Sequence, residues 1–134
     1  MPTHQSSASH RKWVTDDQSR VPYWVYTDDD IYQQEQAKIF AGSSWNYLAL
    51  SAEIPEPGDF KKTTVGDKPI VVNRDKEGEL HAFVNRCAHR GVMFCQHETG
   101  NADEFMCPYH QWVYDQKGAL VGVPFRRGIK RQGG

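Results

Sequence analysis

The sequence predicts a mainly β fold: a small antiparallel sandwich or barrel with two loops that carry cysteine and histidine, preceded by a short helix. From residue 45 onwards, short runs rich in β-branched and aromatic residues alternate with turn sequences such as "DKEGE". Apolar residues recur at helical spacing in one stretch, 28–42. Cysteines and histidines gather in short pairs within a single segment, 85–112.

The N-terminal part of the chain is predicted to hold the helix. Residues 1–20 are polar and aperiodic, which predicts a flexible tail. Residues 21–44 form an aromatic lead-in, "VPYWVY", followed by the helix. Asp28 is placed to cap the helix and Gly42 to end it.

The expected strands follow from residue 45 to residue 125. Turn signals separate them, and Lys117-Gly118 marks the turn of a closing hairpin. A polar tail, 126–134, ends the chain. The expected strand segments are 45–54, 60–65, 69–74 and 79–86, with a hairpin over 112–123.

Composition narrows the class of protein. The 134 residues suffice for one modest domain, and 38% are hydrophobic. The net charge of −1 and the lack of a basic stripe argue against a nucleic-acid partner. No apolar run is long enough to cross a membrane, and "MPTHQSSASHRK" lacks the apolar core of a secretory signal. We therefore expect a cytoplasmic protein.

The segment 85–112 contains all three cysteines and three of the six histidines. Three cysteines cannot all pair within one chain, and clustered Cys and His in the cytosol indicate metal chemistry more often than disulfides. The residues form three pairs, Cys87-x-His89, Cys95-x-His97 and Cys107-x-x-His110.

Two kinds of metal centre compete for these residues. A zinc ion takes four Cys and His ligands in a tetrahedron. A [2Fe-2S] cluster with mixed ligands needs two thiolates on one iron and two imidazoles on the other. Two loops that each supply one Cys and one His meet the second requirement directly.

Spacing favours Cys87 and His89 over Cys95 and His97 as the partners of the third pair. Seventeen residues lie between His89 and Cys107, enough for a strand, a turn at "ETGNADE" and a returning strand, whereas nine lie between His97 and Cys107. The predicted ligands are thus Cys87, His89, Cys107 and His110. Cys95 is expected to be an interior strand residue and His97 a solvent-facing one.

Neighbouring residues are candidates for a supporting role. Gly91 permits a turn with positive φ, and Pro108 stiffens its loop while leaving other N–H groups to bond the sulfurs. Tyr109 and Trp112 either shield a cluster or are plain core aromatics. Arg90 either pairs with an acidic group across a subunit interface or is a solvated surface charge.

The motifs "CAHRG", "CPYHQW" and "YDQKGAL" resemble the Rieske [2Fe-2S] domain of the large (alpha) subunit of bacterial aromatic-ring-hydroxylating dioxygenases. The resemblance covers the chain from about Val21 to its end, and the lead-in is similar to the subgroup acting on anthranilate, salicylate or benzoate. It implies that Cys87 and Cys107 bind the buried iron, and that His89 and His110 bind the outer iron.

The resemblance also implies partners and a reaction. A reductase or ferredoxin fed by NAD(P)H supplies electrons, which pass to a mononuclear iron that hydroxylates an aromatic substrate with O₂. A small beta subunit and further alpha subunits complete an α3 or α3β3 assembly. Because family members are considerably longer and their mononuclear iron lies in a C-terminal domain, we expect this chain to be a fragment that carries electrons without oxygenating. His4, His10 and His81 have no expected role in that iron site.

Two other functions stay open from the sequence. A standalone Rieske ferredoxin would share the cluster but would lack the long lead-in, the Arg90 after the histidine and the "YHQW" loop. A zinc-stabilised binding module would use any four of the six candidate ligands and would be colourless.

Overall fold

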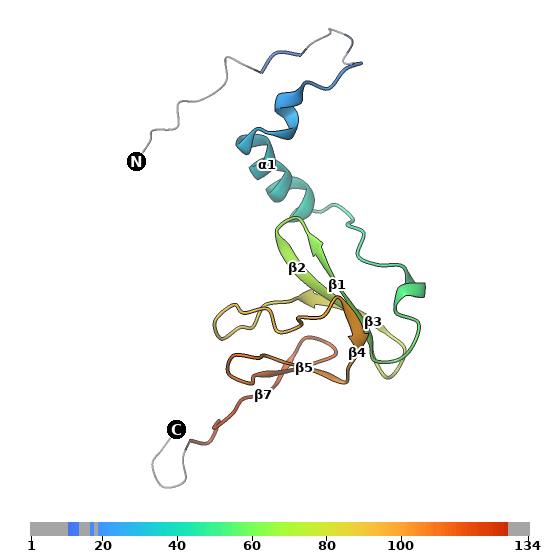
Figure 1. Ribbon diagram of the computed structural model, residues 1–134, viewed down its shortest axis with the longest axis vertical. Coiled ribbons are helices and arrows are strands. Elements are labelled where there is room, and N and C mark those ends of the chain that lie inside the picture. The colour runs from blue at the N-terminus through green and yellow to red at the C-terminus, as the bar shows by residue number, and fades with distance from the viewer. Residues whose placement is uncertain (1–10, 14–16, 18, 129–134) are drawn as a thin grey trace. The chain divides into compact units, whose positions relative to one another are not determined.

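The structure is a computed structural model that describes residues 11–13, 17 and 19–128 (Figure 1). It divides into two compact units, Met1–Ser44 and Trp45–Gly134. His4, His10 and most of the predicted tail lie outside the described residues. No helix in the described part of the chain is long and apolar enough to cross a membrane.

The first unit contains the predicted helix. A short 3₁₀ turn, Tyr23–Tyr26, leads into α1, Asp29–Glu35, which continues with wider π winding over Gln36–Phe40. The Asp28 carboxylate caps α1 by accepting hydrogen bonds from two backbone N–H groups, as predicted. At Gly42 a Cβ atom would lie 2.1 Å from a backbone carbonyl oxygen, so only glycine fits there.

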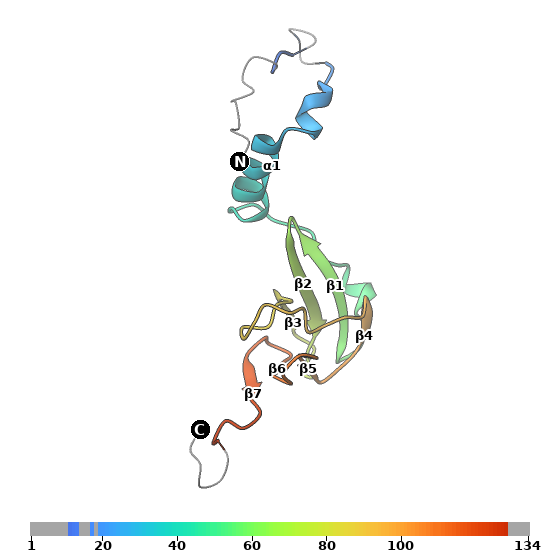
Figure 2. The same cartoon turned by 60° about the vertical axis from the view of Figure 1, so that its left-hand side comes forward.

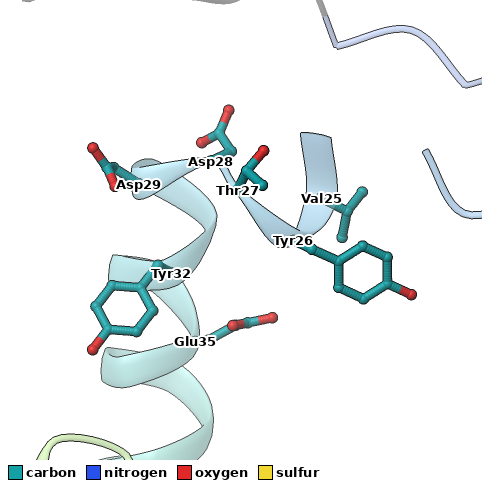
Figure 3. A pocket seen from close by; sticks show the side chains of 7 residues that line it. All are labelled: Val25, Tyr26, Thr27, Asp28, Asp29, Tyr32 and Glu35. Atoms are coloured by element: carbon teal, nitrogen blue, oxygen red, sulfur yellow. The ribbon is translucent and has the colours of Figure 1, made fainter. Parts of the chain in front are cut away.

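A pocket of about 470 Å³ lies within this first unit (Figure 3). Acidic and aromatic side chains line it, and none of its lining residues is a cysteine or histidine. The lining residues are Val25, Tyr26, Thr27, Asp28, Asp29, Tyr32 and Glu35.

The second unit consists of two antiparallel sheets, which confirms the predicted mainly β fold (Figure 2). The larger sheet has the strand order β3-β2-β1-β4 and the smaller has the order β5-β6-β7. The strands are β1 (Asp59–Val65), β2 (Lys68–Arg74), β3 (Leu80–Val84), β4 (Thr99–Asn101), β5 (Glu104–Met106), β6 (Val113–Asp115) and β7 (Leu120–Gly122).

The hydrophobic core draws on both sheets. The Phe60 ring from β1 and the Phe105 ring from β5 meet edge to face at 5.5 Å. Phe94 stacks on Tyr114 of β6 at 4.9 Å. All three cysteines are buried in the same cluster, so the thiols lie in the best-packed region of the unit.

The strand predicted at 45–54 was wrong. This segment contains only a 3₁₀ turn, Ser51–Glu53. The Glu53 carboxylate accepts hydrogen bonds from Leu50 N at 2.8 Å and from the Tyr47 hydroxyl at 3.2 Å. The Leu50 N–H is thus paired with a nearby side chain and not with a strand partner.

The hairpin predicted around "ETGNADE" was also wrong, because its two strands belong to different sheets. β4 pairs with β1, whereas β5 pairs with β6. Asn101 anchors β4 through bonds from its amide nitrogen to Pro57 O at 2.8 Å and to the Asp59 carboxylate at 2.9 Å.

Two turns of identical design close the hairpins β2–β3 and β6–β7. Asp75 and Asp115 each accept, at one carboxylate oxygen, the N–H groups two and four residues later. Asp75 is 2% exposed, and its other oxygen lies 2.6 Å from His81 Nε2 and 3.9 Å from Lys117 Nζ. This carboxylate therefore links its own turn to the turn of the other sheet.

We expect the Asp75 carboxylate to stabilise the fold in a pH-dependent way. The hydrogen bond with His81 holds the pKa of Asp75 below its ordinary value, although burial opposes this. A depressed folded pKa adds stability above the unfolded value of about 3.9, and this stability is lost as the pH falls through the folded value. Urea unfolding between pH 7 and pH 3 should show this loss. Asp75→Asn should have a lower free energy of unfolding at pH 7, and that free energy should fall less as the pH is lowered.

His81→Gln removes the imidazole that bonds the Asp75 carboxylate, and it should also weaken the acid dependence of the free energy of unfolding. An Asp75→Asn variant with the acid dependence of the unmodified chain would contradict this role.

Candidate metal centre

Two loops with the same backbone design carry the predicted ligands. In the first, Cys87 N donates to Val92 O at 2.8 Å and Gly91 N donates to Cys87 O at 2.7 Å. In the second, the same two bonds join Cys107 N to Trp112 O at 2.8 Å and Gln111 N to Cys107 O at 2.9 Å. Each loop therefore begins at its cysteine and closes through a backbone bond to the residue five positions later.

Both loops need a left-handed residue four positions after the cysteine. Gly91 has φ 70°, as the sequence predicts, and Gln111 has φ 58°. A left-handed non-glycine residue is uncommon, and nothing in the sequence marked Gln111 for this role. The second loop joins β5 to β6 as a hairpin tip, whereas no regular strand follows the first loop before β4.

The two loop cysteines lie side by side in the core. Cys87 is 3% exposed and Cys107 is 1% exposed. Burial raises the pKa of Cys87, but hydrogen bonds from the Tyr114 hydroxyl, the His89 N–H and the Cys107 thiol outweigh it, so the pKa is lowered. This favours the thiolate, which is the form that binds metals.

Tyr114 contacts the first loop, and sequence reasoning did not single it out. Its hydroxyl donates to Cys87 Sγ at 3.3 Å and accepts from Ala88 N at 2.9 Å. Burial raises the pKa of the Tyr114 phenol, and the Cys87 sulfur raises it further. Its position two residues after Trp112 was the available signal, because alternate strand residues share a face.

The two loop histidines lie together on the outer side of the cysteines. The His89 and His110 ring centroids are 4.6 Å apart. His89 is exposed and His110 is half-buried. Burial lowers the pKa of His110, and the nearby His89 and Arg90 charges lower it further. A lowered pKa favours the neutral imidazole, which is the ligand form of histidine.

The four side chains form two pairs. Within the described residues, no three His, Cys, Asp or Glu side chains converge to hold one metal ion. A mixed-ligand [2Fe-2S] cluster asks for only two protein ligands at each iron. The buried thiol pair and the outer imidazole pair fit that donor set.

Aromatic and cationic side chains surround the histidines. Trp112 stacks on His89 with ring centroids 4.8 Å apart and planes within 9°. The Tyr109 ring lies 3.8 Å from His110 and is tilted by 37°. The Arg90 guanidinium sits 5.9 Å from the Tyr109 ring centroid, close enough for a cation–π contact. Pro108 is exposed at the turn of the second loop.

Cys95 and His97 stand apart from the four. Cys95 is buried as predicted, and burial raises the pKa of its thiol. It does not lie in a strand, because the Asn85 side chain takes the place of a strand partner. The Asn85 amide donates to Cys95 O at 2.8 Å and accepts from Cys95 N at 2.9 Å. His97 is exposed, as expected.

Two sheets that present paired cysteines and histidines on two loops define an iron–sulfur class of protein. The chain belongs to the Rieske [2Fe-2S] domain family, which matches residues 44–131. That match leaves out most of the first unit.

Longer relatives resemble nearly the whole chain. The large oxygenase component of salicylate 5-hydroxylase from Ralstonia sp. is 50% identical over 91% of this chain. The large subunit of anthranilate 1,2-dioxygenase from Burkholderia cepacia is 53% identical over 94% of it. The chain spans 29% and 30% of the length of these two relatives.

A solved structure shares the fold. Naphthalene 1,2-dioxygenase from Rhodococcus sp., bound to indole, superposes with a TM-score of 0.73 and 39% identity. The superposition covers 82% of this chain and 25% of that one.

Proposed function

We propose that Cys87 and Cys107 bind the inner iron of a [2Fe-2S] cluster, and that His89 and His110 bind its outer iron. The observation that carries this proposal is the pair of equivalent loops, each with one buried thiol and one outer imidazole. The cluster, when bound, takes up and releases one electron. The chain serves as the electron-transfer domain of an aromatic-ring-hydroxylating oxygenase.

Residues around the thiols set the reduction potential of the proposed cluster. The Tyr114 hydroxyl and the backbone N–H groups of His89 and Arg90 bond the Cys87 sulfur. Such donors stabilise added negative charge and raise the reduction potential. The positive φ of Gly91 turns the first loop and that of Gln111 turns the second, where the ring of Pro108 also restricts the backbone.

The oxygenase assignment is supported by similarity beyond the Rieske domain. The Ralstonia and Burkholderia relatives align over 122 and 126 residues, which extends well beyond residues 44–131 into the aromatic lead-in. A reductase or ferredoxin fed by NAD(P)H is the proposed electron donor. The proposed acceptor is a mononuclear iron that hydroxylates an aromatic carboxylate with O₂, within an α3 or α3β3 assembly.

Metal analysis tests the ligand set. Anaerobically purified protein should contain about two irons and two sulfides per chain, with a Rieske-type paramagnetic resonance signal after reduction. Cys87→Ser and Cys107→Ser should each lose the cluster. Cys95→Ser is the matched control, because it is also a buried free thiol, and it should keep the cluster. Stoichiometric zinc, or cluster loss in the control alone, would contradict the assignment.

Tyr114→Phe should lower the reduction potential of the cluster. One hydrogen bond contributes about 1 kcal/mol, which corresponds to a shift on the order of 40 mV for a one-electron couple. Spectroelectrochemical titration measures this shift. Tyr47→Phe removes a hydroxyl that bonds Glu53 instead, and should leave the potential unchanged. An unchanged potential in Tyr114→Phe would show that this bond does not tune the cluster.

Electron delivery tests the oxygenase assignment. NADH with the reductase component of an anthranilate dioxygenase should bleach the visible absorbance of the oxidised chain under anaerobic conditions. Dithionite provides the reference for full reduction. A cluster that dithionite reduces fully, but that oxygenase reductases and their ferredoxins leave oxidised, would contradict the proposed electron donor.

A further inference from the structure

Trp112 joins the two loops through a side chain. Its backbone belongs to the second loop, where its carbonyl accepts from Cys107 N at 2.8 Å. Its indole ring lies flat against His89 of the first loop, with centroids 4.8 Å apart and planes within 9°. The indole is also partly buried against the hydrophobic core, so its own orientation is restrained.

Trp112 and Tyr114 act on the first loop from one short stretch of chain. They are two residues apart, and alternate residues of an extended strand point to the same side. Tyr114 contacts Cys87 and Ala88, while Trp112 contacts His89. The start of β6, the central strand of the smaller sheet, thus supports both proposed ligands of the first loop.

The two imidazoles are held in different ways. The aromatic neighbour of His110 is Tyr109, the adjacent residue, which is 54% exposed and tilted by 37°. The aromatic neighbour of His89 comes from the other loop, is partly buried and lies parallel. A parallel, restrained ring blocks rotation of the imidazole about its terminal torsion, which is broad for histidine when nothing restrains it.

We propose that Trp112 is a positioning residue that sets the plane of the His89 imidazole and slows loss of the outer iron. This inference rests on the proposed function, because it takes His89 as an iron ligand. Removing groups that orient a metal ligand typically costs about 10- to 100-fold in metal affinity. Because Trp112 contacts His89 and not His110, its loss should affect one imidazole only. A general loosening of the fold would affect both.

The test compares Trp112→Leu with Trp112→Phe in the reduced, cluster-loaded protein labelled with ¹⁵N-histidine. Electron–nuclear double resonance reports a separate coupling for each ligand imidazole. Trp112→Leu should shift one coupling, leave the other, and shorten the half-life of the visible absorbance under chelator by about tenfold. Trp112→Phe keeps a flat ring and should fall between Trp112→Leu and the unmodified chain.

Two controls frame this comparison. Trp45→Leu makes the same chemical change at a fully exposed tryptophan and should alter neither coupling. Tyr109→Leu should perturb the coupling that Trp112→Leu leaves unchanged, because Tyr109 contacts His110.

Unchanged couplings and half-life in Trp112→Leu would overturn the inference, as would equal shifts of both couplings. If Trp112→Leu acquires no cluster, the outcome depends on Trp112→Phe. Cluster acquisition with one shifted coupling supports the inference, and failure to acquire a cluster contradicts a role that needs only a flat ring. An unmodified chain without two histidine couplings would instead refute the proposed function.

Discussion

The rest of the structure depends on the placement of two thiols in the core between the sheets. Cys87 and Cys107 enter the aromatic cluster of Phe60, Phe94 and Phe105 from two loops. One loop follows β3 of the larger sheet, and the other joins β5 to β6 of the smaller sheet. A buried thiol is costly to ionise, so this position demands hydrogen-bond donors. The Tyr114 hydroxyl and the loop N–H groups supply them. Packing and cofactor chemistry therefore require the same residues.

The two loops follow the same backbone path with different sequences. Both return to their cysteine within five residues and pass through a left-handed residue, Gly91 or Gln111. The first places its histidine two residues after the cysteine and the second places it three residues after. Because the backbones match, this offset sends the imidazoles to different positions on the same outer edge, where their rings meet.

Sequence reasoning recovered what depends on spacing and local turn chemistry. The helix cap at Asp28, the hairpin at Gly118, the positive φ at Gly91 and the burial of Cys95 all follow from local patterns. It failed where a side chain replaces a strand partner. Glu53 bonds the Leu50 N–H in the segment expected to be the first strand, and Asn85 bonds both the N–H and the carbonyl of Cys95. Such long-range or side-chain substitutes leave no periodic signal.

The thiols and the imidazoles of the site differ in burial, and this difference suits them to different roles. The thiols are sealed by the core, where a low dielectric strengthens every hydrogen bond to sulfur. The imidazoles lie at the surface, where a partner can approach. In the proposed function, the inner residues around Tyr114 would set the reduction potential of the cluster, and the exposed edge would exchange electrons with a partner. Trp112 lies between these two regions, half in the core and half against His89. In the proposed role, Trp112 would therefore carry restraint from the packed core to the exposed His89 imidazole.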